Sequence, residues 1–323
     1  MSESEASVKS ASRLLGCILV VWTWLLMALG ALTRASHAGI ACPDWPLCHG
    51  QFIPALDAAF YPADPRYAVF RVYFEFIHRI VAGLLAVGTA IFVTIAWRRT
   101  MRWTASWLVA ILTLQIAMGA VTVWLRNAPF TVVVHLALAL SFLAVLIASL
   151  HPFGVQLSVE PPPPYLTRAY EIWGVTVAMQ ILLGGVVSSR SIGLACFDFP
   201  LCNGLPIPVY WTEPIAWQMA HRALGYTVLL GAFAILATAR IGGAGPRERR
   251  IAAILVLGVS VQIVLGGLNV WFRVPPLVSA AHLACAVLLF AVAVERVASG
   301  LLGTIRPFVP LALGDRHPRR HPG

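Results

Sequence analysis

The chain has 323 residues, of which 59% are hydrophobic and only 11% are charged, and its formal net charge is +10. An average soluble domain has roughly 25% charged residues, so the composition excludes an ordinary soluble protein. In a soluble protein this positive charge would indicate nucleic-acid binding. Long apolar runs indicate membrane lipid instead, and we expect no nucleic-acid partner.

Eight apolar segments approach or exceed the roughly 20 residues that cross a bilayer as a helix. Four of them have no charged residue: Leu14–Leu32, Trp103–Leu125, Ile172–Ser189 and Ile251–Phe272. The other four contain a few ionisable residues: about Val69–Trp97, Asn127–Leu150, Pro214–Ala239 and Val274–Val294. The sequence therefore predicts an all-α membrane protein with eight transmembrane helices.

The distribution of Lys and Arg predicts the orientation. With the N-terminus inside, fifteen basic residues lie in inner segments: Lys9, Arg13, Arg98, Arg99, Arg102, Arg168, Arg240, Arg247, Arg249, Arg250, Arg296, Arg306, Arg316, Arg319 and Arg320. Six lie in outer segments: Arg34, Arg66, Arg71, Arg126, Arg190 and Arg273. The positive-inside rule then predicts that both termini are cytoplasmic. Because Met1–Lys9 resembles neither a transit peptide nor a signal peptide, we expect a bacterial plasma membrane.

The first span leads into an outer loop that reads ACPDWPLCHG at Ala41–Gly50. The second span then carries Glu75, His78 and Arg79. Glu75 and His78 are three residues apart and so share a helix face. A carboxylate inside a membrane is costly and is by default a functional candidate. The alternative is that Glu75 only pairs with Arg79, four residues further on.

Arg126 lies where the third span emerges on the outer side, and the fourth span contains His135. His78 and His135 each fall six to nine residues into a helix that starts on the outer side, which is roughly 9–13 Å along the axis. Two histidines at the same depth can face each other inside one bundle. Because imidazole nitrogen is the usual axial ligand of haem iron, we predict a haem between them.

A proline-rich segment, EPPPP at Glu160–Pro164, separates this half from a second copy of it. Gln115–Ala139 aligns without a gap on Gln262–Ala286, and the outer loop recurs as ACFDFPLCNG at Ala195–Gly204. We therefore expect two tandem four-helix bundles related by a pseudo-two-fold axis along the membrane normal. The predicted division is residues 1–155, a cytoplasmic linker at 156–166, residues 167–300 and a basic cytoplasmic tail at 301–323.

The second half repeats the histidines as His221 and His282, but Gln218 replaces the carboxylate of Glu75. This contrast predicts one half that reacts and one that does not. Zinc is the rival metal, but it requires four nitrogen or sulfur ligands. Since no CxxCH motif occurs, the haems would be bound non-covalently.

Four arginines lie near the predicted haems: Arg79, Arg126, Arg222 and Arg273. Arginine binds carboxylates bidentately, so we expect these side chains to contact haem propionates. The alternative is that they reach the membrane surface without touching a cofactor.

The E-x-x-H-R of Glu75–Arg79, the Q-x-x-H-R of Gln218–Arg222, the second histidine of each half and the CPDWPLC-type loops together resemble the haem A synthase family. The resemblance implies oxidation of the C8 methyl group of haem O to a formyl group, through successive hydroxylations, to supply haem A for terminal oxidases.

The resemblance also implies roles for individual residues. His78 and His135 would hold the substrate and product haem, with Glu75 as a catalytic acid/base or charge-stabilising group. His221 and His282 would ligate a permanent haem b that relays electrons. The implied partners are haem O, an unidentified electron donor, haem O synthase and cytochrome oxidase assembly factors.

The two outer loops each contain two cysteines, Cys42 with Cys48 and Cys196 with Cys202. They are close in sequence and face an oxidising compartment in this topology, so we expect one disulfide in each loop. The alternative is thiols that take part in redox exchange or haem delivery. Cys17 and Cys285 lie within helices and are interpreted as packing residues.

Two other functions remain open from the sequence. A di-haem cytochrome b would pass electrons without changing the porphyrin. A transporter with parallel repeats would need broken helices or polar residues near the midplane, where this sequence has Leu, Val, Ala and Gly.

Overall fold

The computed structural model describes residues 3–98, 101–155 and 160–302, and the side chains from residue 10 onward. The predicted cytoplasmic tail beyond residue 302 and part of the linker, 156–159, lie outside the described residues. The described part contains eight long α-helices and three short 3₁₀ turns, with no strand. The long helices are α1 (Glu3–Ala35), α2 (Val69–Arg98), α3 (Arg102–Trp124), α4 (Pro129–Ala148), α5 (Pro164–Ser189), α6 (Glu213–Ile241), α7 (Pro246–Trp271) and α8 (Pro276–Leu302).

All eight helices lie in segments that are long and apolar enough to cross a membrane. This confirms the prediction of an all-α protein with eight spans. Proline starts four of the helices, where its missing N–H costs nothing and its fixed φ suits the first turn: Pro129, Pro164, Pro246 and Pro276.

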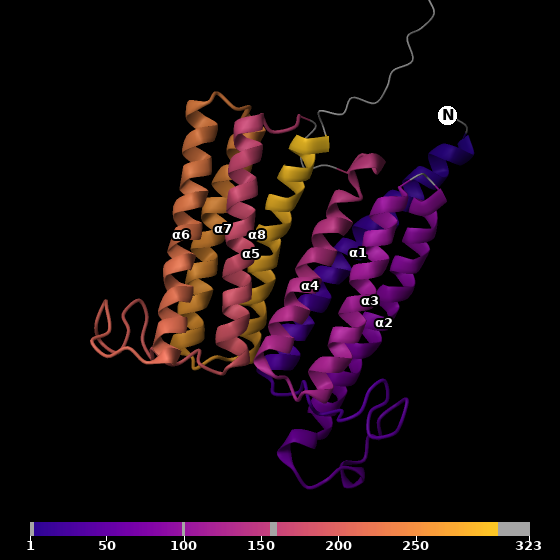
Figure 1. Ribbon diagram of the computed structural model, residues 1–323, viewed down its shortest axis with the longest axis vertical. Coiled ribbons are helices and arrows are strands. Elements are labelled where there is room, and N and C mark those ends of the chain that lie inside the picture. The colour runs from indigo at the N-terminus through magenta and orange to yellow at the C-terminus, as the bar shows by residue number, and fades with distance from the viewer. Residues whose placement is uncertain (1–2, 99–100, 156–159, 303–323) are drawn as a thin grey trace, which may run out of the picture.

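Helices α1–α4 lie on one side of the molecule and α5–α8 on the other (Figure 1). We call these sets the first half and the second half. They meet along α1, α4, α5 and α8, because α1 packs on α8 and α4 packs on both α5 and α8. Leu19, Phe92, Leu108 and Leu146 are among the residues at the centre of the first half. The pseudo-two-fold axis and the boundaries of the two predicted bundles stay predictions.

The two long loops, between α1 and α2 and between α5 and α6, lie at the same end of the molecule (Figure 1). The start of α1 and the end of α8 lie at the opposite end. The first loop leads into the start of α2, which carries His78, and the second leads into the start of α6, which carries His221.

Candidate functional site

The four histidines that the sequence singles out occur on α2, α4, α6 and α8, within the first three turns of each helix. In the second half the rings of His221 and His282 have their centroids 6.4 Å apart, with an angle of 68° between the ring planes. In the first half the structure places His78 and His135 within range of an electrostatic interaction. The structure thus brings together the pairs that the sequence pattern indicates.

Each of these rings packs against a glycine on the preceding helix. A Cβ atom added to the glycine would lie 3.0–3.4 Å from Cε1 of the ring, which is too close for most real contacts. The four pairs are Gly30 with His78, Gly119 with His135, Gly184 with His221, and Gly266 with His282. The sequence pattern does not single out these glycines, although they recur at matching positions of the repeat.

The four rings share an unusual deficit of hydrogen bonds. Nδ1 of His78, His135, His221 and His282 is buried and has no hydrogen-bond partner. Of their Nε2 atoms, that of His135 lies 3.2 Å from the side-chain nitrogen of Gln115, which can donate to it. Because buried polar atoms in native proteins are nearly always paired, four unpaired nitrogens in matching places indicate bound ligands.

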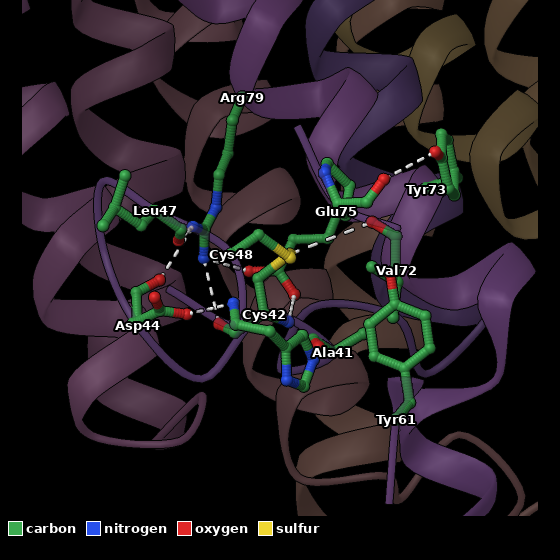
Figure 2. The surroundings of a disulfide bond; sticks show 12 residues. Ala41, Cys42, Asp44, Leu47, Cys48, Tyr61, Val72, Tyr73, Glu75 and Arg79 are labelled. Carbon is green, nitrogen blue, oxygen red and sulfur yellow. Dashed lines mark hydrogen bonds and ion pairs between the residues drawn. A yellow bond between two sulfur atoms is a disulfide. The ribbon is translucent and has the colours of Figure 1, made fainter. Parts of the chain in front are cut away.

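Glu75 is buried, at 4% exposure, and holds the loop between α1 and α2 in place (Figure 2). Its Oε2 accepts a hydrogen bond from the backbone nitrogen of Cys42 at 2.8 Å, and its Oε1 forms a 2.6 Å ion pair with Arg79. The pairing with Arg79 that the sequence left as an alternative is therefore present. Arg79 lies one turn away and compensates this buried carboxylate.

Gln218 occupies the same place in the second half and makes the matching contact. Its side-chain oxygen accepts from the backbone nitrogen of Cys196 at 2.6 Å, and its nitrogen donates to the carbonyl of Gly193 at 2.6 Å. A carboxylate could not make the second of these bonds. The two residues therefore share a structural role and differ in charge.

Arg79 and Arg222 clamp their loops through backbone carbonyls. Arg79 donates to the carbonyl oxygens of Cys42, Asp44 and Leu47 at 2.6–3.0 Å, as Figure 2 shows. Arg222 donates to three carbonyls at the matching positions of its loop: Cys196, Asp198 and Leu201. These carbonyls accept hydrogen bonds from both arginines without a propionate. A propionate contact stays a prediction.

Both predicted disulfides are present, Cys42–Cys48 and Cys196–Cys202, each with its Cα atoms 4.6 Å apart. An aspartate closes each loop by accepting two backbone N–H groups. Asp44 accepts from His49 and Gly50, and Asp198 accepts from Asn203 and Gly204. The remaining cysteines of the described residues, Cys17 and Cys285, are free.

Arg126 and Arg273 are exposed and lie in the turns that join α3 to α4 and α7 to α8. Both have a positive φ, 50° for Arg126 and 59° for Arg273. Arg126 borders a cavity of about 210 Å³, whose lining also includes Arg34 and Asn127. Their contact with a propionate stays a prediction.

Comparison with known proteins agrees with this geometry. Residues 13–294 match the family described as cytochrome oxidase assembly protein. The chain belongs to this family. A haem A synthase of Geobacillus thermodenitrificans is 30% identical over 266 residues, covering 78% of this chain and 80% of that protein. A haem A synthase of Shouchella clausii is 30% identical over 220 residues, covering 65% and 69%. A haem A synthase of Caulobacter sp. is 26% identical over 318 residues, covering 85% and 92%.

The histidine pairs fit haem iron better than a bare metal ion. Zinc takes four ligands, and within the described residues no group of three or more His, Cys, Asp or Glu could hold a metal ion. Haem iron needs only two axial ligands from the protein. The ring centroids of His221 and His282 are 6.4 Å apart. This separation suits one metal atom bound by a nitrogen of each ring, because imidazole–metal bonds are about 2 Å.

Proposed function

We propose that this membrane protein is a haem A synthase, which oxidises the C8 methyl group of haem O to a formyl group and so supplies haem A for terminal oxidases. The observation that carries the proposal is the duplicated pair of histidines with unpaired buried nitrogens, in a chain whose relatives are named haem A synthases. The four glycines that face the rings support it, since a Cβ at each would press on Cε1 of its histidine.

In this proposal His78 and His135 hold haem O in the first half, and His221 and His282 hold haem b in the second. When bound, haem b supplies a one-electron redox centre that relays electrons. The protein positions both groups through the helix pairs that carry the histidines, and its apolar spans exclude water from them.

Glu75 is the residue of the first half that we assign to chemistry. It is one helical turn from His78 on the side of the outer loop, so its carboxylate lies near the edge of a porphyrin held there. The hydrogen bond from Cys42 and the ion pair with Arg79 fix its position. A carboxylate held in this way can accept a proton or stabilise positive charge beside the methyl group. Gln218 can do neither, which supports a non-reacting second half.

The proposal includes the orientation and the domains that the sequence predicts. Both termini are cytoplasmic, the disulfide loops face the outer compartment of a bacterial plasma membrane, and each loop covers the mouth of one haem site. Haem O enters the half formed by residues 1–155, and residues 167–300 retain haem b. Haem O synthase, an electron donor and oxidase assembly factors are the partners of this activity.

Identification of the bound pigments by mass tests the proposal. Protein purified from cells that make haem O is expected to carry haem O or haem A together with haem b. His78→Leu should lose only the first pigment and formyl production, whereas the matched His221→Leu should lose haem b. Haem b alone, in both halves and with no oxidised porphyrin in any preparation, would support a di-haem cytochrome b instead.

A further inference from the structure

The cavity of about 210 Å³ that Arg126 borders lies where the two halves meet, at the loop end of the helices. Its lining combines three elements: the end of α1 with Arg34 and His37, the turn from α3 to α4 with Arg126 and Asn127, and the last turn of α5 with Ser189. No Asp or Glu is among the described residues that line it. Two arginines therefore share a small cavity without a carboxylate to balance them.

The guanidinium of Arg34 is held in place but not neutralised. Its Nη2 donates to the carbonyls of Ser188 and Ser189 at 3.1 and 3.0 Å, which joins the end of α1 to the end of α5. Its Nε is buried and has no hydrogen-bond partner, and Arg34 forms no ion pair with any described residue. Because charges away from water are usually paired, this arrangement indicates a bound anion.

The cavity is shaped by a close approach of two loops. A Cβ atom at Gly39 would lie 2.9 Å from Nδ2 of Asn127, so a larger residue would push the turn from α3 to α4 away from the end of α1. Pockets for drug-sized ligands are usually larger, about 300 Å³ or more. A cavity of about 210 Å³ suits a small anionic group instead of a whole porphyrin.

The cavity lies at the level where the helices leave the membrane. The spanning part of α1 ends at Ala35, that of α3 ends at Trp124, and that of α5 ends at Ser189. Trp124 is 61% exposed, as is typical of tryptophan at the level of the lipid headgroups. A phospholipid phosphate lies at this level and can reach both arginines without entering the apolar interior.

The second half does not repeat the charges of this cavity. The two halves align without a gap from Gly30 with Gly184 to Cys42 with Cys196, and in this register serines replace two of the lining residues: Ser188 replaces Arg34, and Ser191 replaces His37. In the second alignment Arg273 matches Arg126, but Val274 replaces Asn127. The pair of arginines is therefore particular to the junction of α1, α4 and α5.

We propose that the cavity binds the phosphate group of a phospholipid with net negative charge, such as phosphatidylglycerol, and that this lipid joins the two halves at their loop end. Arginine binds phosphate through two parallel hydrogen bonds, and basic pockets between transmembrane helices bind anionic headgroups. The lining includes α5 and no residue of α2, which carries His78. This position favours a lipid over the haem propionate predicted for Arg126. The inference does not depend on haem A synthesis.

Lipid retention in matched variants tests the proposal. The full-length protein is purified in detergent and supplied with phosphatidylglycerol or phosphatidylcholine, and bound lipid is counted by native mass spectrometry while the unfolding temperature is recorded. Arg34→Gln and Arg126→Gln each remove one positive charge from the cavity. Arg126 is exposed, so its variant gives an answer even where Arg34→Gln fails to fold. Arg273→Gln is the matched control, in the corresponding turn of the second half.

We expect the unmodified protein to retain phosphatidylglycerol in preference to phosphatidylcholine and to unfold at a higher temperature with it, because a ligand stabilises the state that binds it. Arg34→Gln and Arg126→Gln should each weaken this binding about tenfold or more, since each loses a charge-assisted contact to phosphate. Arg273→Gln should leave it unchanged.

Three results would overturn the proposal. The first is equal retention of phosphatidylglycerol by the unmodified protein and all three variants. The second is a rise in unfolding temperature with inorganic phosphate as large as that with phosphatidylglycerol, without any retained lipid, because the occupant would then be a free anion. The third is loss of haem O from Arg126→Gln with lipid retention unchanged, because the occupant would then be a propionate.

Discussion

At the scale of single residues, the difference between the two halves is concentrated in Glu75 and Gln218. Both accept a hydrogen bond from the first cysteine of their disulfide loop, so position and burial are alike. Only Glu75 carries a charge, and Arg79 balances it at 2.6 Å. A difference of charge at constant shape is what a division into a reacting and a non-reacting half requires.

We predict that Glu75→Gln keeps haem binding and lowers haem A formation by about 100-fold or more, the usual contribution of a positioned acid or base. The amide can still accept from Cys42, and Arg79 keeps its three carbonyl partners. Haem A formation in isolated membranes, normalised to bound haem, measures the effect.

Gln218→Glu is the matched control. It sets a carboxylate against the carbonyl of Gly193, so we expect a lower unfolding temperature with conversion per bound haem retained. Normal haem A formation by Glu75→Gln would leave Glu75 only its structural role in holding the loop and Arg79.

At the scale of helices, hydrophobicity and length are enough to predict all eight spans from the sequence. The boundaries are less accurate where charges lie inside a helix. The sequence predicts that the last span ends at about Val294, but α8 continues to Leu302, and Glu295 and Arg296 are buried within it. The sequence predicts a fifth span from Ile172, but α5 starts at Pro164, and its first turns carry the exposed ion pair of Arg168 and Glu171.

The histidine pairs could also be predicted, since equal depth on neighbouring helices follows from residue counting. The glycines opposite them could not, because glycine in a membrane helix has many uses and only the packing shows which ring each one faces. The same holds for the loop carbonyls bound by Arg79 and Arg222, whose positions depend on how each loop folds back over its helix.

Packing of α5 on α6 leads to a prediction for Gly184. A side chain there would press on His221, since even a Cβ would lie 3.0 Å from its Cε1. We expect Gly184→Val to displace the ring, weaken haem b binding and shift the haem b absorption bands. Gly83→Val is the control, because a Cβ at Gly83 meets nothing within 4 Å. A spectrum and haem b content identical in both variants would show that the glycine does not position the histidine.

At the scale of the whole molecule, a buried charge cluster joins elements that are far apart in the sequence. Arg296 on α8 is fully buried and forms ion pairs with Glu248 on α7 at 3.1 Å and with its neighbour Glu295 at 3.4 Å. Tyr170 on α5 donates to Glu248 at 2.6 Å. Arg296 also donates to the carbonyl of Glu160, in the linker between the halves. The cluster could not be predicted, because only the packing of three helices brings these residues together.

The cluster lies at the end of the second half opposite its disulfide loop, since the residues come from the end of α8 and the starts of α5 and α7. The loop end of each half is fixed by an arginine bound to carbonyls, whereas this end is fixed by paired charges. A buried ion pair contributes little net stability, but removal of one partner leaves an uncompensated charge. Arg296 is the one cation in the described part of this cluster that faces two carboxylates, so the cost should be largest there.

We therefore predict that Arg296→Met lowers the free energy of unfolding by about 3 kcal/mol or more, the usual cost of breaking a buried pair, and lowers the unfolding temperature accordingly. Thermal unfolding of the purified protein in detergent, followed with and without bound haem, measures this.

Arg168→Met is the matched control: its ion pair with Glu171 is exposed, with side chains 69% and 49% accessible, and should contribute at most about 1 kcal/mol. Adding Glu248→Gln to Arg296→Met should restore part of the stability, because one lone carboxylate is then removed. Equal unfolding temperatures for Arg296→Met and Arg168→Met would mean that the cluster does not hold the second half together.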